Sequence, residues 1–436
     1  MKENKKTNKI LSLLIKTWEN NESDIFDHKS DVINGNEDYI FERSFLVRTK
    51  DNKYNKLNQQ IYIEDEDDLI FGISIGNKDT YTLINPIQKK LEYTEENINY
   101  INNKIWYVIK PEDSKDDSNC NEEYYLNKND IIRIGRLKFV VQEIYLKPRD
   151  NENNKNNIND APKVGPKTYN ISDLNKNKDP VFDFVFKVDN IPTDDKKECD
   201  YCKYKDDLIT EDGEDFLFHF CKCKDSIIIH YKCFKSYIIN YNSREKKETI
   251  DSSPLPLSFE YTKDEKDNVV SITLKNFHCP KCFRPIPIRY KLPDSDKIYN
   301  IFDMEEPKNC DYMILESLEN KEYEENYKSI HIIQLSEKNN IYIGRDNTKN
   351  NIYSKDISMS RDHAILKYNS KTGKITLQDR KSKFGTLVLV KSPIKIFNKK
   401  IYLQVGRTYI EASLINREDF ENKNKEKKEI DNKPNN

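Results

Sequence analysis

Seven cysteines and one histidine are gathered in one segment of the chain, in four close pairs. In order they are Cys199, Cys202, Cys221, Cys223, His230, Cys233, Cys279 and Cys282. Zinc prefers four tetrahedral ligands of thiolate sulfur or imidazole nitrogen, and a two-residue gap lets both side chains of one tight turn reach the same ion. Eight ligands complete two sites and leave no position for water or substrate. We therefore expect two structural Zn²⁺ ions and no catalytic metal.

The other two of the nine cysteines, Cys120 and Cys310, lie outside this cluster and are expected to be ordinary thiols. Clustered cysteines in a long intracellular chain bind metal more often than they form disulfides, because the compartment is reducing. Lysines stand beside several of the ligands, and their charge is expected to lower the pKa of the thiols. They are Lys203, Lys222, Lys224 and Lys281.

The order of the ligands, with Cys in fourth and His in fifth place, resembles the RING-CH variant of the RING finger. The single residue between Cys221 and Cys223 argues against the PHD finger, which has a longer gap there. Apolar residues after Cys233 predict a short helix, and two β-like runs between Phe259 and Phe277 predict a hairpin in the long last gap. The resemblance covers residues 195–290.

The resemblance implies a cross-brace, in which the first and third ligand pairs hold one ion and the second and fourth pairs hold the other. It also implies that a ubiquitin-conjugating enzyme is recruited. The matching contact positions are Tyr201, Pro280 and Arg284. The tryptophan usual between the sixth and seventh ligands is missing, and Tyr237 stands nearest to its place. Two interpretations therefore stay open, a ubiquitin ligase and a zinc-folded interaction surface.

A second group of residues, in the last quarter of the chain, is suited to binding a phosphate. Phosphate near neutral pH carries about −1.5 to −2 charges and strong acceptor oxygens. Arg345 offers a planar guanidinium fork, Ser360 a short hydroxyl donor and Lys383 a point charge. These residues stand in the runs Gly344-Arg345, Ser360-Arg361-Asp362-His363 and Ser382-Lys383-Phe384-Gly385-Thr386.

In order and spacing these runs resemble the FHA (forkhead-associated) domain, which implies a β-sandwich at residues 328–416 whose loops bind phosphothreonine peptides. By the resemblance, the phosphopeptide contacts are Arg345, Ser360, Arg361 and Lys383. The residues expected to support the loops without touching ligand are Gly344, His363, Gly385 and Thr386. Phe384 stands where the family usually has asparagine, so we expect phosphate binding with a different peptide selectivity.

The rest of the chain predicts a multidomain, mainly β protein. Residues 38–148 alternate β-like stretches with polar turns and are expected to form an FHA-like domain without a phosphate site. A low-complexity linker is expected at 149–181 and a disordered tail at 417–436. The apolar run Ile10–Ile15 predicts a short amphipathic helix.

A faint internal repeat links the two β-rich regions. Arg133-Ile134-Gly135-Arg136 and Gln404-Val405-Gly406-Arg407 each precede a β-rich stretch that closes its block. Two related β-domains would explain the repeat, and so would coincidence in a chain of biased composition.

The composition and net charge limit the kinds of partner that the protein is expected to bind. The 436 residues are 36% hydrophobic and 34% charged, which is too polar for one continuous globule. A net charge of −2 gives no general attraction to nucleic acid or anionic membrane. No apolar run approaches the ~18 residues that cross a bilayer. We expect an intracellular protein of the nucleus or cytoplasm, with no membrane or nucleic-acid partner.

No P-loop, nucleophile elbow or kinase motif is present in the sequence, so binding functions remain. The first hypothesis is a phosphorylation-directed RING-type ubiquitin ligase, in which the FHA-like domain selects a phosphothreonine protein and the zinc module positions a conjugating enzyme. The alternative is a non-catalytic, phosphorylation-dependent adaptor whose zinc module is purely structural.

Overall fold

The computed structural model describes part of the chain in detail. The described residues are 8–17, 34–40, 44–48, 54–57, 69–75, 80–84, 91–92, 104–109, 123–147, 182–183, 186–187, 198–204, 215–221, 223, 227–236, 258–263, 269–275, 277, 279, 281–282, 286–292, 297–302, 307, 309–318, 327–338, 340–396 and 400–422. Within these ranges no helix has the length and apolar character needed to cross a bilayer. Strands dominate, which confirms the predicted mainly β architecture.

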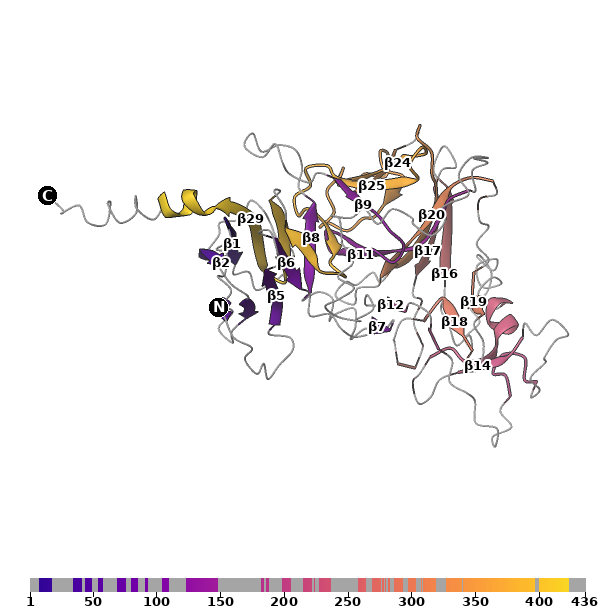
Figure 1. The fold of residues 1–436 in the computed structure, drawn as a ribbon. Helices are drawn as coiled ribbons and strands as arrows, with labels where there is room; N and C mark the ends of the chain where they lie inside the picture. Colours follow the sequence, from indigo (N-terminus) through magenta and orange to yellow (C-terminus); the bar gives the residue numbers. More distant parts are fainter. Residues whose placement is uncertain are drawn as a thin grey trace, which may run out of the picture.

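A twelve-stranded sheet, antiparallel throughout, runs through the molecule (Figure 1). Its strands, in spatial order, are β16 (Ser258–Lys263), β17 (Val269–Lys275), β21 (Tyr327–Gln334), β20 (Tyr312–Leu318), β11 (Leu137–Tyr145), β10 (Ile131–Ile134), β26 (Thr386–Leu389), β8 (Ile105–Ile109), β28 (Ile401–Val405), β29 (Thr408–Asn416), β1 (Lys9–Thr17) and β2 (Asn34–Ile40).

Two five-stranded sheets accompany it, and buried side chains of all three sheets form one apolar core. The first sheet contains β23 (Ile352–Tyr353), β22 (Ile341–Gly344), β24 (Ala364–Asn369), β25 (Lys374–Asp379) and β9 (Glu123–Tyr125). The second contains β27 (Ile394–Ile396), β6 (Tyr81–Ile84), β5 (Leu69–Ile75), β3 (Ser44–Arg48) and β4 (Tyr54–Leu57). In Figure 1, β24, β25 and β9 lie near β11 and β20, whereas β5 and β6 lie near β1 and β29. The arrangement is two β-sandwiches that share the large sheet.

Each sandwich is completed by strands from the other end of the chain. The hairpin β10–β11 lies between β26 and β20, and the hairpin β28–β29 lies between β8 and β1. In the smaller sheets, β9 pairs with β25 and β27 pairs with β6. The sheets therefore cut across the predicted ranges 38–148 and 328–416, because each range supplies the closing hairpin of the other sandwich.

The two exchanged hairpins have the same local structure. Their turns contain Gly135 and Gly406, with φ angles of 63° and 54°. The side chain two residues earlier donates to the glycine carbonyl in both, from Arg133 Nε at 3.1 Å and from Gln404 Nε2 at 3.0 Å. The sequence repeat therefore corresponds to two equivalent hairpins, as expected of two related β-domains.

The prediction of a helix at Ile10–Ile15 is wrong. This run lies in β1, which pairs with β29 over all of its nine residues and with β2 on its other side. Leu11 and Leu13 are fully buried there, and so is Ile10 on the opposite face of the strand. A strand buried on both faces shows a continuous apolar run, which periodicity alone does not distinguish from a short helix.

The predicted linker at 149–181 lies outside the described residues. The predicted disordered tail is wrong at its start, because residues 417–422 are helical. The Arg417 amide donates to the Asn8 carbonyl at 2.9 Å, and the Phe420 ring lies 4.6 Å from the ring of Tyr39. These contacts hold the helical turn against the N-terminal strands.

The cysteine-rich segment packs against the large sheet around a second apolar core, to which β17, β20 and β21 also contribute. It contains the hairpin β14 (Leu217–His219) and β15 (Ile228–His230), a helical turn at 231–236, and a small sheet of β13 (Phe186–Lys187), β18 (Arg289–Lys291) and β19 (Ile298–Asn300). A separate parallel pair joins β7 (Leu91–Glu92) to β12 (Phe182–Asp183). Aromatic rings fill the core of the segment, with Phe220 stacked on Phe234 at 5.1 Å.

The hairpin predicted between Phe259 and Phe277 is confirmed as β16–β17. It extends the large sheet, since β17 pairs with β21 along its whole length. A buried ion triad fixes the same junction. Glu316 on β20 pairs with Arg289 on β18 and, at 2.8 Å, with Lys328 on β21. The cysteine-rich segment and the C-terminal β-strands therefore form a continuous body.

Candidate functional site

Three loops that follow strands of one five-stranded sheet are tied together by hydrogen bonds that backbone amides donate. Arg345 follows β22, and its amide donates to the Ser360 carbonyl at 2.9 Å. The Lys383 amide, in the loop after β25, donates to the Ser360 hydroxyl oxygen at 3.0 Å. Arg361 joins the same group, because its carbonyl accepts from the Asp346 amide at 3.3 Å. The structure thus brings the four predicted phosphopeptide contacts to one place.

His363 braces these loops from inside. The ring is fully buried, and its Nδ1 accepts from the Ser360 amide at 3.0 Å. Its Nε2 lies 3.1 Å from the Gly385 carbonyl and must donate to it. Burial disfavours the charged ring and lowers the pKa of His363, so the ring stays neutral in this tautomer. These contacts agree with the structural role expected for His363 and Gly385.

Gly344 and Thr386 also serve the loops. A Cβ on Gly344 would lie 2.3 Å from the Arg361 carbonyl oxygen, so any larger residue would force the two loops apart. Thr386 is fully buried, and its hydroxyl donates to Asp379 at 2.7 Å. Asp379 also accepts from the amide and the hydroxyl of Ser382, at 2.9 Å and 2.6 Å. One carboxylate thereby shapes the loop that carries Lys383.

The cationic side chains near these loops differ in their burial and in their ionic partners. Arg380 forms an ion pair, since its Nε lies 2.6 Å from Asp362, and its guanidinium lies over the Tyr342 ring. Arg345 is half-buried, and no carboxylate of the described residues forms an ion pair with it. Arg361 and Lys383 are exposed. An arginine that is half-buried and has no carboxylate partner among the described residues is suited to a doubly charged anion such as phosphate.

Asn350 supports the loops in a way that sequence reasoning missed. Its side-chain amide donates to the carbonyls of Asp346 and Arg361, at 2.7 Å each. The chain here is rich in asparagine. The spacing of Asn350 therefore carried no signal that would have set it apart.

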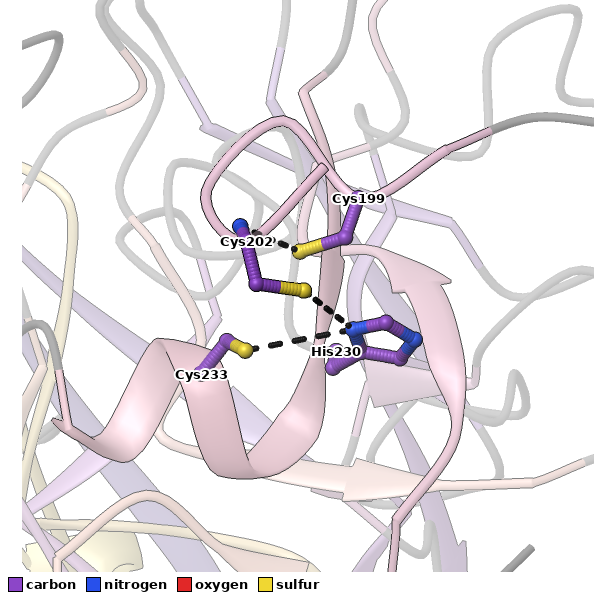
Figure 2. Close-up of side chains that lie close together, drawn as sticks. All are labelled: Cys199, Cys202, His230 and Cys233. Atoms are coloured by element: carbon purple, nitrogen blue, oxygen red, sulfur yellow. Dashed lines mark hydrogen bonds between the residues drawn. The ribbon is translucent and has the colours of Figure 1, made fainter. Parts of the chain in front are cut away.

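The first metal-ligand group consists of Cys199, Cys202, His230 and Cys233, whose donor atoms all lie within 4.8 Å of one another. Figure 2 shows the three sulfurs converging on one edge of the His230 ring. Nδ1 is the facing atom, at 3.3 Å from the Cys202 sulfur and 3.9 Å from that of Cys233. The turn is closed by Lys203, which has a φ of 64° and donates to the Cys199 carbonyl at 2.9 Å.

The second group consists of Cys221, Cys223, Cys279 and Cys282, also within 4.8 Å of one another. The Cys221 and Cys282 sulfurs are 3.4 Å apart, and those of Cys223 and Cys279 are 3.7 Å apart. A tetrahedron with Zn–S bonds of ~2.3 Å has edges of about 3.8 Å. These separations suit one tetrahedral zinc ion, and the two groups have the grouping implied by the cross-brace.

The thiol environments explain why such groups need a cation. Burial is the largest influence on Cys223 and, with neighbouring thiols, raises its pKa to about 11. Burial likewise raises the pKa of Cys221 and Cys233. At Cys199 burial opposes ionisation, but hydrogen bonds from Cys202 and other backbone amides lower the pKa to about 7. Several clustered thiolates are stable near neutral pH only with a metal ion to balance their charge.

The expected conjugating-enzyme contacts are only partly placed. Tyr201 lies in the turn between Cys199 and Cys202, and 45% of its surface is exposed. Pro280 and Arg284 lie outside the described residues.

Comparison with known proteins supports the expectation that these loops bind phosphate. Residues 341–408 match the family model of the FHA domain, so the chain carries an FHA domain in its C-terminal part. FHA domains bind phosphothreonine-containing proteins. No curated protein and no solved structure matches the chain.

Proposed function

We propose that this protein binds phosphothreonine peptides through Arg345, Ser360, Arg361 and Lys383. The observation that carries the proposal is the hydrogen-bonded junction of the three loops at Ser360, which accepts from Arg345 through its carbonyl and from Lys383 through its hydroxyl. Phosphate contacts of this kind are charge-assisted and gain from loops that are ordered before binding.

Selectivity is expected to come from the loop after β25. Phe384 occupies the place where the family usually has asparagine, and the Lys383 ammonium lies 5.1 Å from the centre of its ring. An aromatic side chain there replaces an amide grip on the peptide backbone with an apolar contact. We expect a preference for peptides with an apolar side chain next to the phosphothreonine.

A degenerate peptide library with a fixed phosphothreonine tests the proposal, with the same library carrying threonine or phosphoserine as the control. Capture by the full-length protein of the phosphothreonine library alone is the expected result. Equal capture of the unphosphorylated library would overturn it.

We further propose that two Zn²⁺ ions fold the cysteine-rich segment and that this segment recruits a ubiquitin-conjugating enzyme. The supporting observations are the cross-braced ligand grouping and the exposure of Tyr201 in the first turn. The protein would supply no nucleophile. It would hold a charged conjugating enzyme near a phosphorylated partner, so that a lysine of the partner attacks the thioester.

A specific observation favours the alternative, a non-catalytic adaptor. The long gap between Cys233 and Cys279 is filled by a hairpin that belongs to the large sheet, which makes the zinc segment a brace of the β-sandwich. Autoubiquitination with a panel of conjugating enzymes separates the two functions. Activity that Pro280→Ala abolishes supports the ligase, and absence of activity with every enzyme supports the adaptor.

A further inference from the structure

The phosphothreonine-binding loops belong to a sandwich that the C-terminal region does not complete by itself. On one side of the loop that carries Lys383, strand β25 pairs with β9 through Thr376 and Tyr125. On the other side, β26 pairs with β10 through Thr386 and Ile134. Both β9 and β10 come from the first third of the chain. The strands that flank this loop are therefore held by residues far from it in sequence.

The turn of the hairpin β10–β11 touches the loop that carries Ser360. The Arg136 amide donates to the hydroxyl oxygen of Ser358 at 2.8 Å. Ser358 is buried, and its own hydroxyl donates to Asp356 at 2.6 Å. The contact thus joins the turn to a Ser-Asp cluster two residues before Ser360. The chain separation across this hydrogen bond is 222 residues.

The approach is close enough to require glycine. A Cβ on Gly135 would lie 2.5 Å from the Ser358 hydroxyl oxygen and 2.7 Å from its carbonyl oxygen. Because one of these atoms is backbone, rotation of a side chain does not relieve the overlap. The loop itself would have to move.

The equivalent turn of the other hairpin provides the comparison. Gly406 has a φ of 54°, close to the 63° of Gly135. Its hairpin lies between β8 and β1, within the other sandwich. The two glycines therefore share a backbone conformation but lie in different sandwiches, and only Gly135 lies against Ser358.

We propose that Gly135 and Arg136, in a hairpin supplied by the N-terminal region, are positioning residues that hold the Ser358–Ser360 loop in its phosphothreonine-binding shape. The inference deepens the proposed function and rests on it. It means that the segment matched by the family model, residues 341–408, is not a self-sufficient phosphopeptide-binding unit. A change in the N-terminal region can alter phosphopeptide affinity without touching any residue that contacts the ligand.

The test compares Gly135→Asn with Gly406→Asn in the full-length protein. Asparagine tolerates left-handed backbone better than other non-glycine residues, so both variants keep most of the fold. Only the variant at Gly135 places a Cβ against Ser358. Calorimetric titration with a phosphothreonine peptide selected from the degenerate library measures affinity, and thermal unfolding measures stability.

We expect Gly135→Asn to lower the affinity for the phosphothreonine peptide at least about tenfold, which is the equivalent of one hydrogen bond. Gly406→Asn should bind the peptide with the affinity of the wild type. Equal affinity of all three proteins overturns the inference, and so does an equal loss in both variants. If Gly135→Asn does not fold, Ser358→Ala is the second variant, because it removes the hydroxyl oxygen that accepts from the Arg136 amide. Retained affinity in Ser358→Ala overturns the inference. Failure of the wild type to bind any phosphothreonine peptide overturns the proposed function itself, which distinguishes the two failures.

Discussion

The buried carboxylate of Glu316 allows a quantitative test of how the cysteine-rich segment is joined to the β-sandwich. Its side chain is 1% exposed and pairs with Arg289 from the small sheet of the cysteine-rich segment and with Lys328 from the large sheet. Glu316→Gln keeps the shape and leaves two buried cations without a counter-charge. Removing one partner of a buried ion pair costs about 3–5 kcal/mol. We expect a loss of stability in this range.

Glu411 provides the matched control, because it also lies between two lysines. Lys16 and Lys400 are each 3.7 Å away, and the side chain is 17% exposed. Longer and more solvated pairs of this kind are worth about 0–1 kcal/mol. Glu411→Gln should therefore leave the urea midpoint almost unchanged, whereas Glu316→Gln should lower it by roughly 1–2 M.

The pH dependence adds a second check on the triad. Burial of Glu316 opposes ionisation, but the charges of Arg289 and Lys328 outweigh it and lower the pKa. A carboxyl with a lowered folded pKa stabilises fully above its unfolded pKa of about 4.3, and this contribution is lost as pH falls through the folded value. The gap between wild type and Glu316→Gln should be constant from pH 7 to 5 and shrink below. A gap of less than 1 kcal/mol at pH 7 would refute the reasoning.

Two further predictions follow from the same geometry. His331 is buried, and burial lowers its pKa to about 4. As pH falls, the unfolded chain therefore takes up a proton at this histidine before the folded protein does. The free energy of unfolding, measured by thermal unfolding relative to His331→Gln, should drop by about 3 kcal/mol between pH 6.5 and 4. Mass spectrometry of the native protein should find two zinc ions per chain, and Cys202→Ser or Cys223→Ser should each remove one; an unchanged metal content in either variant would contradict the ligand groups.

The local sites could be predicted from the sequence because their signals are short. Pairs such as Cys199–Cys202 stand on one turn, and the run from Ser360 to His363 stands on one loop. Residue type and spacing then determine which atoms can meet, independently of the rest of the fold. The grouping of four distant pairs into two metal sites came from the family resemblance, and the geometry agrees with it.

The exchange of hairpins was beyond the sequence because the two hairpins are alike. Both β10 and β28 are buried throughout, and both turns contain a left-handed glycine after an apolar residue. A pattern of burial indicates that a hairpin enters a sheet but not which strands flank it there. Tertiary contacts determine that Ile134 pairs with Thr386 and that Val405 pairs with Ile105.

The helix prediction for Ile10–Ile15 failed for a related reason. A short apolar run fits one face of a helix or both faces of a central strand. Its partner, β29, lies almost 400 residues away in sequence, since Thr17 and Thr408 share a side-chain contact at a separation of 391. Local periodicity contains no information about such a partner.

The central claim is that Arg345, which is half-buried, binds the phosphate of a phosphothreonine peptide through its guanidinium. Calorimetric titration of the full-length protein with a selected phosphothreonine peptide tests it directly, with Arg345→Ala as the variant and Arg407→Ala, in the turn of the other hairpin, as the charge-matched control. A charge-assisted contact of about 1.5–3 kcal/mol corresponds to an affinity loss of roughly 10- to 150-fold in Arg345→Ala. The control should bind like the wild type. Unchanged affinity in Arg345→Ala, or equal binding of the unphosphorylated peptide, would contradict the account.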